Sequence, residues 1–218
     1  MMWRRPAICV ITRGRGSARS AERSALLARL GAAAAAGATM VQVRERQFAD
    51  RELLEFVRQL VTEVRPAGAH VLVNERTDVA LAAGADGVHL KSNAPAVSDV
   101  RRVVPAEFLI GQSVHTQEEA AAVEAAGGCD YLFYGTVFPS SSKPSDHPIA
   151  GVAALAAVCR RVRIPVVAIG GISIELAPQV MSAGAAGVAA ISLFSESGDI
   201  AATVRSLRAA LTLPAGNG

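Results

Sequence analysis

The stretch LVNERTDVALAAGADGVHL, residues Leu72–Leu90, contains the pattern on which the fold prediction depends. It opens with an apolar run that ends at Asn74, and a second short apolar run begins at Gly87. Between them, residues 77–83 have a helical period, and Gly84 follows where a helix would end. A strand, a helix and another strand in this order are typical of a βα unit.

The same alternation continues along the whole chain. Strands are predicted at Ala7–Ile11, Met40–Arg44, Val71–Asn74, Gly87–Leu90, Phe108–Ser113, Tyr131–Gly135, Val166–Ile169 and Gly187–Ile191. Helices are predicted near 21–36, 49–64, 77–83, 96–103, 116–126, 151–161, 174–183 and 200–211.

Eight βα repeats without a linker or a change in composition predict an α/β chain that forms a single (β/α)8 TIM barrel. We expect one domain over 1–218, with the barrel over about 7–211 and a flexible C-terminal tail, TLPAGNG. A doubly wound open sheet is the alternative.

Composition narrows the class of protein. With 218 residues, 51% of them hydrophobic, the chain is long enough to bury a large core. A net charge of +3 and scattered arginines argue against nucleic acid as a partner, and no apolar run is long enough for a membrane span. Three cysteines in separate apolar runs indicate reduced, buried thiols and a cytoplasmic protein. Small molecules are the expected partners.

In such a barrel the reactive groups lie at the carboxyl ends of the strands. After the second strand, period 2 sends Gln42, Arg44 and Arg46 to one side, which is either a polar site or a cap that is salt-bridged to Glu45. After the third strand, Asn74 and Glu75 are oxygen donors suited to Mg²⁺.

The fourth and fifth strands each add one candidate. His89 is either a hydrogen-bonded barrel residue or a catalytic group, and Ser113 faces the same way as Gln42 and Arg44. Two residues after Ser113, His115 is either structural or part of the pocket.

The last three strands end in groups that bind anions. Gly170-Gly171 and Ile191-Ser192 follow the seventh and eighth strands, the common phosphate site of barrel enzymes. The stretch YGTVFPSSSK, Tyr134–Lys143, supplies Ser140, Ser142 and Lys143 as further donors. Two anionic groups can therefore be held together, while His147, in an SDHP turn, is expected to face solvent.

These residues, in this order, resemble the thiamine phosphate synthase and TenI superfamily. The similarity runs from about Ala7 to Ser195 and includes VQVRER, LVNERTDVALAAGADGVHL, IGQSVHTQEEA, DYLFYGTVFPSSSK, IPVVAIGGIS and AGAAGVAAISLF. The resemblance implies a synthase that joins a hydroxymethylpyrimidine pyrophosphate to a thiazole phosphate with Mg²⁺, and it allows a homodimer.

Transferred from the family, Lys143, Arg44 and Ser113 would be catalytic. Substrates would be bound by Gln42, Arg46, Asn74, Ser140, Ser142, Gly170, Gly171, Ile191 and Ser192, and Glu75 would bind the metal. Ser140 and Ser142 stand where the family has threonines, and Arg46 stands where it has a lysine.

Two departures from the family leave alternatives open. The synthases have HLGQxD after the fourth strand, whereas this chain has His89-Leu90-Lys91-Ser92-Asn93-Ala94 and lacks the last metal carboxylate. TenI-like tautomerases lack that aspartate too, but their histidine is replaced here by Thr136. The synthase is favoured because the serine-rich lysine loop is retained. A TenI-like thiazole tautomerase and a non-catalytic thiazole phosphate or thiamine phosphate binding protein are the alternatives.

Overall fold

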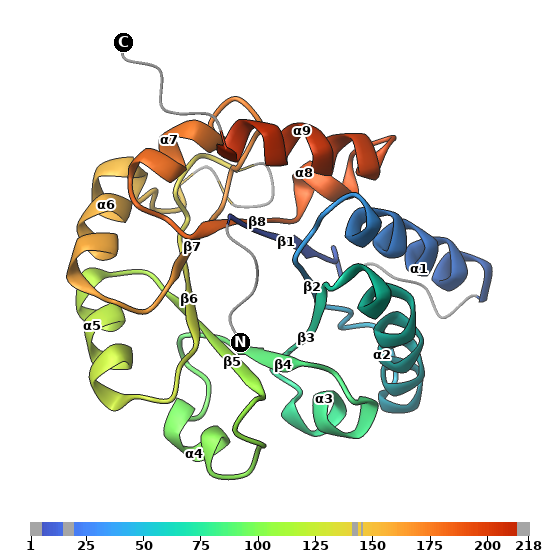
Figure 1. Cartoon of the computed structure of the whole chain (residues 1–218). Helices are drawn as coiled ribbons and strands as arrows, with labels where there is room; N and C mark the ends of the chain where they lie inside the picture. The colour runs from blue at the N-terminus through green and yellow to red at the C-terminus, as the bar shows by residue number, and fades with distance from the viewer. Residues whose placement is uncertain (1–5, 15–19, 141–143, 145, 213–218) are drawn as a thin grey trace.

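The computed structural model describes residues 6–14, 20–140, 144 and 146–212. Parallel strands form a ring that helices surround on the outside (Figure 1). The strands are β1 (Ala7–Ile11), β2 (Met40–Val43), β3 (His70–Asn74), β4 (Gly87–Leu90), β5 (Leu109–Val114), β6 (Tyr131–Tyr134), β7 (Val166–Ile169) and β8 (Gly187–Ala190).

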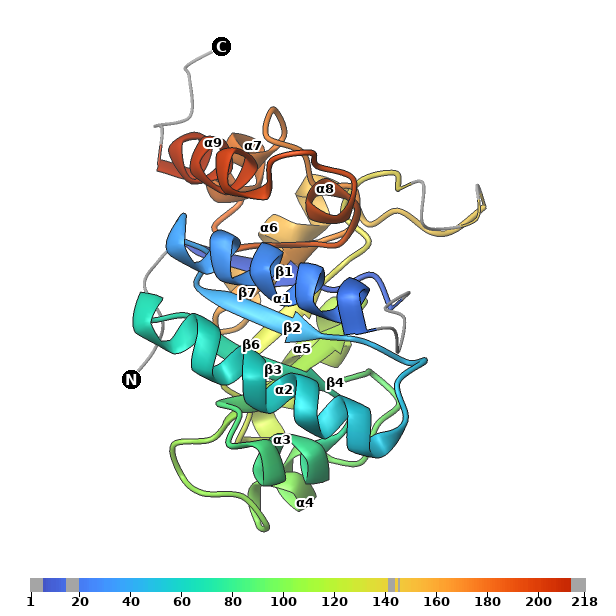
Figure 2. The same cartoon turned by 90° about the vertical axis from the view of Figure 1, so that its right-hand side faces the viewer.

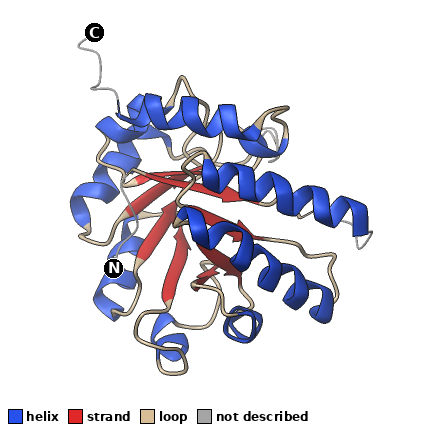
Figure 3. Cartoon of the chain, turned by 45° about the vertical axis from the view of Figure 1, so that its right-hand side comes forward, coloured by secondary structure: helices blue, strands red, loops and turns tan. Residues whose placement is uncertain are grey.

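The helices follow the strands in regular alternation along the chain. Figure 3 shows the helices on the outside and the strands inside. They are α1 (Ser20–Ala35), α2 (Asp50–Val64), α3 (Thr77–Ala83), α4 (Val97–Arg101), α5 (Gln117–Ala126), α6 (Gly151–Arg161), α7 (Ala177–Ser182), α8 (Ser192–Ser195) and α9 (Ile200–Thr212), with the 3-10 helix η1 (Arg65–Ala67) after α2.

Each strand pairs in parallel with the next one, and β8 returns to β1 with Ala7 opposite Gly187. The ring is therefore closed, which confirms the single (β/α)8 barrel and excludes the open doubly wound sheet. The helices predicted near 96–103 and 174–183 are shorter in the structure, and Pro178 stands in the first turn of α7. The four-residue α8 was not predicted because a single turn has no measurable period.

The alternation along each strand separates two apolar layers. One layer fills the inside of the barrel and the other lies between the strands and helices such as α2, whose buried face includes Phe56 and Leu60. The inner layer consists of Ala7, Cys9, Ile11, Met40, Leu72, Leu109, Tyr131, Phe133, Val167 and Ala189. These side chains fill the inside of the barrel. Among the described residues, a ligand can therefore bind at the rim that the carboxyl ends of the strands form.

The cysteines agree in part with the prediction of reduced, buried thiols. All three cysteines are free; Cys9 is buried, whereas Cys129 and Cys159 are half-buried. Burial raises the pKa of Cys129 to about 12 and that of Cys159 to about 11, which keeps these thiols protonated. None of the helices in the described part of the chain has the length and apolar character that crossing a membrane requires.

Gly111 of β5 makes room for the largest side chain of the inner layer. A methyl group at this position would lie 1.9 Å from the ring of Tyr131, which is fully buried. We expect Gly111→Ala to lower the free energy of unfolding by about 2–3 kcal/mol, because the added methyl group would displace a fully buried ring. Urea unfolding followed by circular dichroism measures this change.

Gly198→Ala is the matched control, since its methyl group would meet no atom within 4 Å. We expect that variant to unfold within about 0.5 kcal/mol of the unaltered chain. Equal stability of the two variants would contradict the packing of Tyr131 on Gly111.

Candidate active site

A cavity of about 620 Å³ opens at the carboxyl ends of the strands, and each of the eight strands or the loop after it contributes to its wall. In Figure 2, which shows the barrel from the side, these ends and the loops that follow them lie together at one end of the molecule. This is the position where barrel enzymes hold their substrates. The size fits a ligand with several rings or phosphates.

The wall of this cavity has a polar half and an apolar half. The last inward-facing residues of β2–β5 are polar: Gln42, Asn74, His89 and Ser113. Those on the remaining strands are mainly apolar: Ile11, Phe133, Ile169 and Ile191. The cavity can therefore contact flat apolar rings on one side and hydrogen-bond their polar edges on the other.

Gln42 and Asn74 form the start of a hydrogen-bond chain along the polar half. Gln42 Nε2 donates to Asn74 Oδ1 at 3.0 Å, and Asn74 Nδ2 donates to Glu75 Oε2 at 3.0 Å. Gln42 is 2% exposed, and its Oε1 has no hydrogen-bond partner among the described residues. Since a buried acceptor without a partner is unfavourable, Gln42 Oε1 is the natural contact for a donor on the ligand.

Glu75 and Lys91 close the rim between β3 and β4. Lys91 Nζ lies 2.5 Å from Glu75 Oε2, in a pair that is partly open to solvent. Glu75 has a φ of 62°, and it alone among the described non-glycine residues has a positive φ. This left-handed conformation is unfavourable for a side chain of this size, so its presence at a strand end points to a functional constraint.

Basic side chains gather at the cavity mouth. Arg13, Arg44, Arg46 and Lys91 belong to its wall, and no aspartate or glutamate is among its described lining residues. The backbone N–H of Arg44 donates to Thr12 Oγ1 at 2.8 Å, which fixes the start of this loop. Burial, and then the charge of Arg46, lowers the pKa of Arg44, but arginine stays charged at neutral pH. Such a mouth attracts anions.

His89 is held between two hydroxyl groups inside the barrel. Its Nδ1 lies 3.0 Å from the Tyr131 hydroxyl and its Nε2 lies 2.9 Å from Ser113 Oγ. Burial lowers the pKa of His89 to about 3, so the ring is neutral at physiological pH. The structure therefore favours the hydrogen-bonded barrel residue over a proton carrier, with His89 positioning the hydroxyl of Ser113.

Gly170 and Gly171 follow β7 and line the opposite wall, beside Ser192. A methyl group on Gly171 would lie 2.3 Å from the carbonyl oxygen of Pro139, and one on Gly170 would lie 2.5 Å from Thr136. The glycines are thus required for packing against the segment after β6, in addition to any approach of an anion. This contact brings Ser140, which follows Pro139, to the same cavity.

Two further histidines lie near the end of β6. His115 Nδ1 donates to the carbonyl oxygen of Gly135 at 2.6 Å, and the ring lines the cavity. His147 Nε2 lies 3.0 Å from Thr136 Oγ1 and is half-buried. The prediction that His147 faces solvent is therefore wrong, because its turn folds back onto Thr136.

The structure brings most of the predicted site residues together. The cavity wall contains Gln42, Arg44, Arg46, Asn74, Ser113, Ser140, Gly170, Gly171, Ile191 and Ser192. Glu75 is not in the wall itself, but it forms an ion pair with Lys91, which is. Ser142 and Lys143 lie outside the described residues. Sequence reasoning missed Arg13, although period 2 from Ile11 points to it, and Phe133, which an apolar strand does not distinguish.

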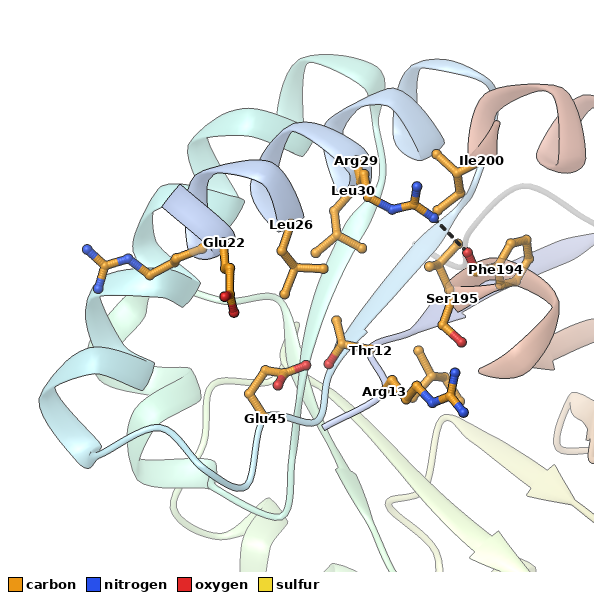
Figure 4. Close-up of a pocket in the computed structure, with 13 residues that line it drawn as sticks. Thr12, Arg13, Glu22, Leu26, Arg29, Leu30, Glu45, Phe194, Ser195 and Ile200 are labelled. Atoms are coloured by element: carbon orange, nitrogen blue, oxygen red, sulfur yellow. Dashed lines mark hydrogen bonds between the residues drawn. The ribbon is translucent and has the colours of Figure 1, made fainter. Parts of the chain in front are cut away.

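A smaller cavity of about 280 Å³ lies between α1, α8 and the end of β1 (Figure 4). Arg29 spans it, donating to the carbonyl oxygens of Phe194 and Ser197 at 2.9 and 3.0 Å. Because α8 begins at Ser192, this contact holds the helix whose first residue lines the larger cavity. The larger cavity, which receives residues from every strand end, is the candidate active site.

The prediction that Glu75 binds Mg²⁺ stays a prediction. The described residues do not form a site that is ready to bind a metal ion, because the Glu75 carboxylate already contacts Lys91 and Asn74. Across the part of the chain that the structure describes, there is no group of three or more histidine, cysteine, aspartate or glutamate side chains that could hold a metal ion. Ala94, at the position of the missing carboxylate, packs against the outer apolar core and is absent from the cavity wall.

The burial of His89 predicts a dependence of stability on pH. The unfolded chain protonates this ring near pH 6.5, whereas the folded chain does so only near pH 3. Stability contributed by the neutral ring is therefore lost as the pH falls from about 6.5 toward 3, by about 3 kcal/mol at pH 4.5. In His89→Gln, the difference in free energy of unfolding between pH 7 and pH 4.5 should shrink by about that amount.

Tyr131→Phe is the control, since it removes a hydroxyl contact and leaves the imidazole buried. It should keep most of the pH dependence of the unaltered chain in urea unfolding experiments at both pH values. If His89→Gln keeps it as well, the assignment of a neutral buried histidine is wrong.

Comparison with known proteins agrees with this geometry. A family model described as thiamine monophosphate synthase matches residues 9–194. The thiamine-phosphate synthase of Methanoculleus marisnigri is 47% identical over 186 residues, covering 84% of this chain and 85% of that protein. That of Methanocella arvoryzae is 41% identical over 180 residues, covering 83% and 84%. The structure of a thiamine phosphate pyrophosphorylase from Pyrococcus furiosus superimposes with a TM-score of 0.82 at 33% identity, over 94% of this chain and 95% of that one. The chain therefore belongs to the thiamine monophosphate synthase family.

Proposed function

We propose that this chain is a transferase that joins hydroxymethylpyrimidine pyrophosphate to a thiazole phosphate, forming thiamine phosphate and releasing pyrophosphate. One observation carries the proposal. A single cavity has a basic, polar side along β2–β5 and a second set of anion donors after β7 and β8. Two phosphorylated substrates fit such a cavity with their rings side by side. Membership of the family and the names of its relatives support the same reaction.

The pyrimidine would lie on the polar half of the cavity. Gln42 Oε1, which lacks a partner among the described residues, would accept a hydrogen bond from an amino group on the ring. Asn74 orients the Gln42 amide, and Phe133 offers an aromatic surface from the other half. The hydroxyl of Ser113, held by His89, would contact the same ring.

The two phosphate groups would lie on either side of the rings. Arg44, Arg46 and Ser140 would bind the pyrophosphate. Ser142 and Lys143, the other predicted donors, lie outside the described residues. Gly171, Ile191 and Ser192 would bind the phosphate of the thiazole through backbone N–H groups and a hydroxyl.

The reaction needs electrostatic stabilisation and alignment more than a protein nucleophile. The bond between the pyrimidine methylene carbon and the pyrophosphate oxygen breaks, and the oxygen keeps the electron pair. The thiazole nitrogen then donates its lone pair to that carbon, which forms the new bond and leaves the thiazole ring positively charged. Arg44, Arg46 and Lys143 would stabilise the leaving pyrophosphate, while the cavity walls hold the two rings in line.

Members of this family are generally metal-dependent. When bound, Mg²⁺ would neutralise charge on the pyrophosphate, and Glu75 is its predicted ligand in this chain. Because Glu75 is paired with Lys91, no step of the proposed mechanism is assigned to the metal. A cytoplasmic location and a homodimer stay predictions.

The tautomerase is less well supported than the synthase. Position 136 carries a threonine, and His89 is neutral with both ring nitrogens engaged. His115 would be the remaining proton carrier on the cavity wall. Its Nδ1 donates to Gly135, so Nε2 is the nitrogen that can accept a proton.

A turnover assay tests the proposal. Purified protein is mixed with hydroxymethylpyrimidine pyrophosphate, thiazole phosphate and Mg²⁺, and thiamine phosphate is followed by fluorescence after oxidation. Formation of thiamine phosphate supports the synthase. If none forms while thiazole phosphate still binds, the tautomerase or the non-catalytic binder replaces it.

The assignment of Ser192 predicts a specific loss of binding. Ser192→Asp should weaken thiazole phosphate binding by at least about tenfold, because a carboxylate would face the phosphate. Ser182→Asp is the matched control, since this exposed serine ends α7 at the opposite end of the barrel. Calorimetric titration of both variants with thiazole phosphate measures the difference, and equal affinity would refute the assignment.

A further inference from the structure

Lysine is rare in this chain. Of 22 basic residues, only Lys91 and Lys143 are lysines, and all the others are arginines. Lys91 follows β4 directly and lines the candidate active site. Lysine presents a compact point charge on a flexible stem, whereas the guanidinium of arginine is broad and planar.

The surrounding residues hold the Lys91 ammonium at the rim. Glu75 Oε2 lies 2.5 Å from Lys91 Nζ and also accepts the Asn74 amide at 3.0 Å. The left-handed backbone at Glu75 turns this residue at the end of β3. Through Asn74, the pair is connected to Gln42 on the same polar half. Glu75 therefore acts as an anchor for a cation that the chain itself provides.

The charge balance at the mouth already favours a polyanion. Arg13, Arg44, Arg46 and Lys91 line the cavity. Arg13 is paired with Glu196 at 3.2 Å and Lys91 with Glu75, so two of the four cations have a carboxylate partner. Side chains of Lys91 and Glu75 are 43% and 33% exposed, so an incoming anion can reach the ammonium from the cavity. A second cation of charge +2 would have to displace Lys91 from Glu75, against repulsion by the arginines.

We propose that the Lys91 ammonium, anchored by Glu75, binds the pyrophosphate group in place of a divalent metal ion, so that this chain binds pyrophosphate without Mg²⁺. The inference rests on the proposed function, because that reaction supplies a pyrophosphate group to this rim. The ammonium has three N–H donors; one meets Glu75 and the others remain for phosphate oxygens. Glu75 has the role of a positioning residue, and Lys91 contacts the leaving group.

Binding of inorganic pyrophosphate tests the proposal without requiring turnover. Calorimetric titrations are run on the full chain in chelator and, separately, in excess Mg²⁺. The unaltered chain should bind in chelator, with affinities in the two conditions that differ by less than about tenfold. Lys91→Met should weaken binding in chelator by about tenfold or more, the loss expected for a charge-assisted hydrogen bond. Arg102→Met, which removes an exposed cation that pairs with Asp99 on α4, should leave it unchanged.

Glu75→Gln distinguishes the lysine from a metal site by the condition in which binding changes. If Glu75 positions Lys91, the variant should change binding in chelator and in Mg²⁺ by similar factors. If Glu75 holds a metal, the same variant should weaken binding specifically in Mg²⁺. Circular dichroism spectra check that each variant is folded.

The outcomes separate this inference from the proposed function. Binding that requires Mg²⁺, or equal binding by Lys91→Met in chelator, overturns the inference, and thiamine phosphate production in the turnover assay would then leave the synthase intact. Metal-free binding that depends on Lys91, without thiamine phosphate production, supports the inference and contradicts the synthase. Absence of pyrophosphate binding in both conditions contradicts both.

Discussion

Closure of a ring of parallel strands is the constraint on which the site depends. Each strand ends at the same rim, and the alternation of side chains sends every second residue inward. Gln42, Asn74, His89 and Ser113 are far apart in the sequence, yet closure places them on one continuous wall. Below them, Tyr131 and the rest of the inner apolar layer fill the barrel, so the ligand is confined to the rim. The apolar packing that stabilises the fold thus also defines the floor of the site.

Within this frame, polar contacts position the side chains of the candidate site. His89 is neutral because it is buried, and its role is to hold the Ser113 hydroxyl. The Gly170-Gly171 pair allows the segment after β6 to pack against the loop after β7. The segment after β6 and the loop after β7, which would bind different phosphates, are therefore in contact. A reaction that joins two phosphorylated molecules would benefit from such a contact, because alignment of the two groups before the bond forms lowers the barrier.

Much of this arrangement follows from the sequence. The repeat of short apolar runs and helical segments predicts the barrel, and strand ends locate Gln42, Arg44, Asn74 and Ser113 on one rim. Other features depend on tertiary contacts that no local pattern contains. One is the contact of His147 with Thr136, and another is the packing of Gly171 against Pro139. Each joins segments whose proximity no local sequence pattern predicts. Likewise, the Lys91–Glu75 pair requires the register between β3 and β4, which sets Asn74 opposite His89.

The central claim is that one basic, polar half of the rim, including Lys91, receives a pyrophosphate group. A crystal structure of the chain with inorganic pyrophosphate, grown in the presence of a chelator, tests it most directly. We expect density for pyrophosphate in contact with Lys91, Arg44 and Arg46, with Glu75 still against Lys91. Pyrophosphate density only beside Gly171 and Ser192 would contradict the account. A second crystal, grown with Mg²⁺ in place of the chelator, gives the other contradicting result: pyrophosphate bound only there, through a metal ion on Glu75.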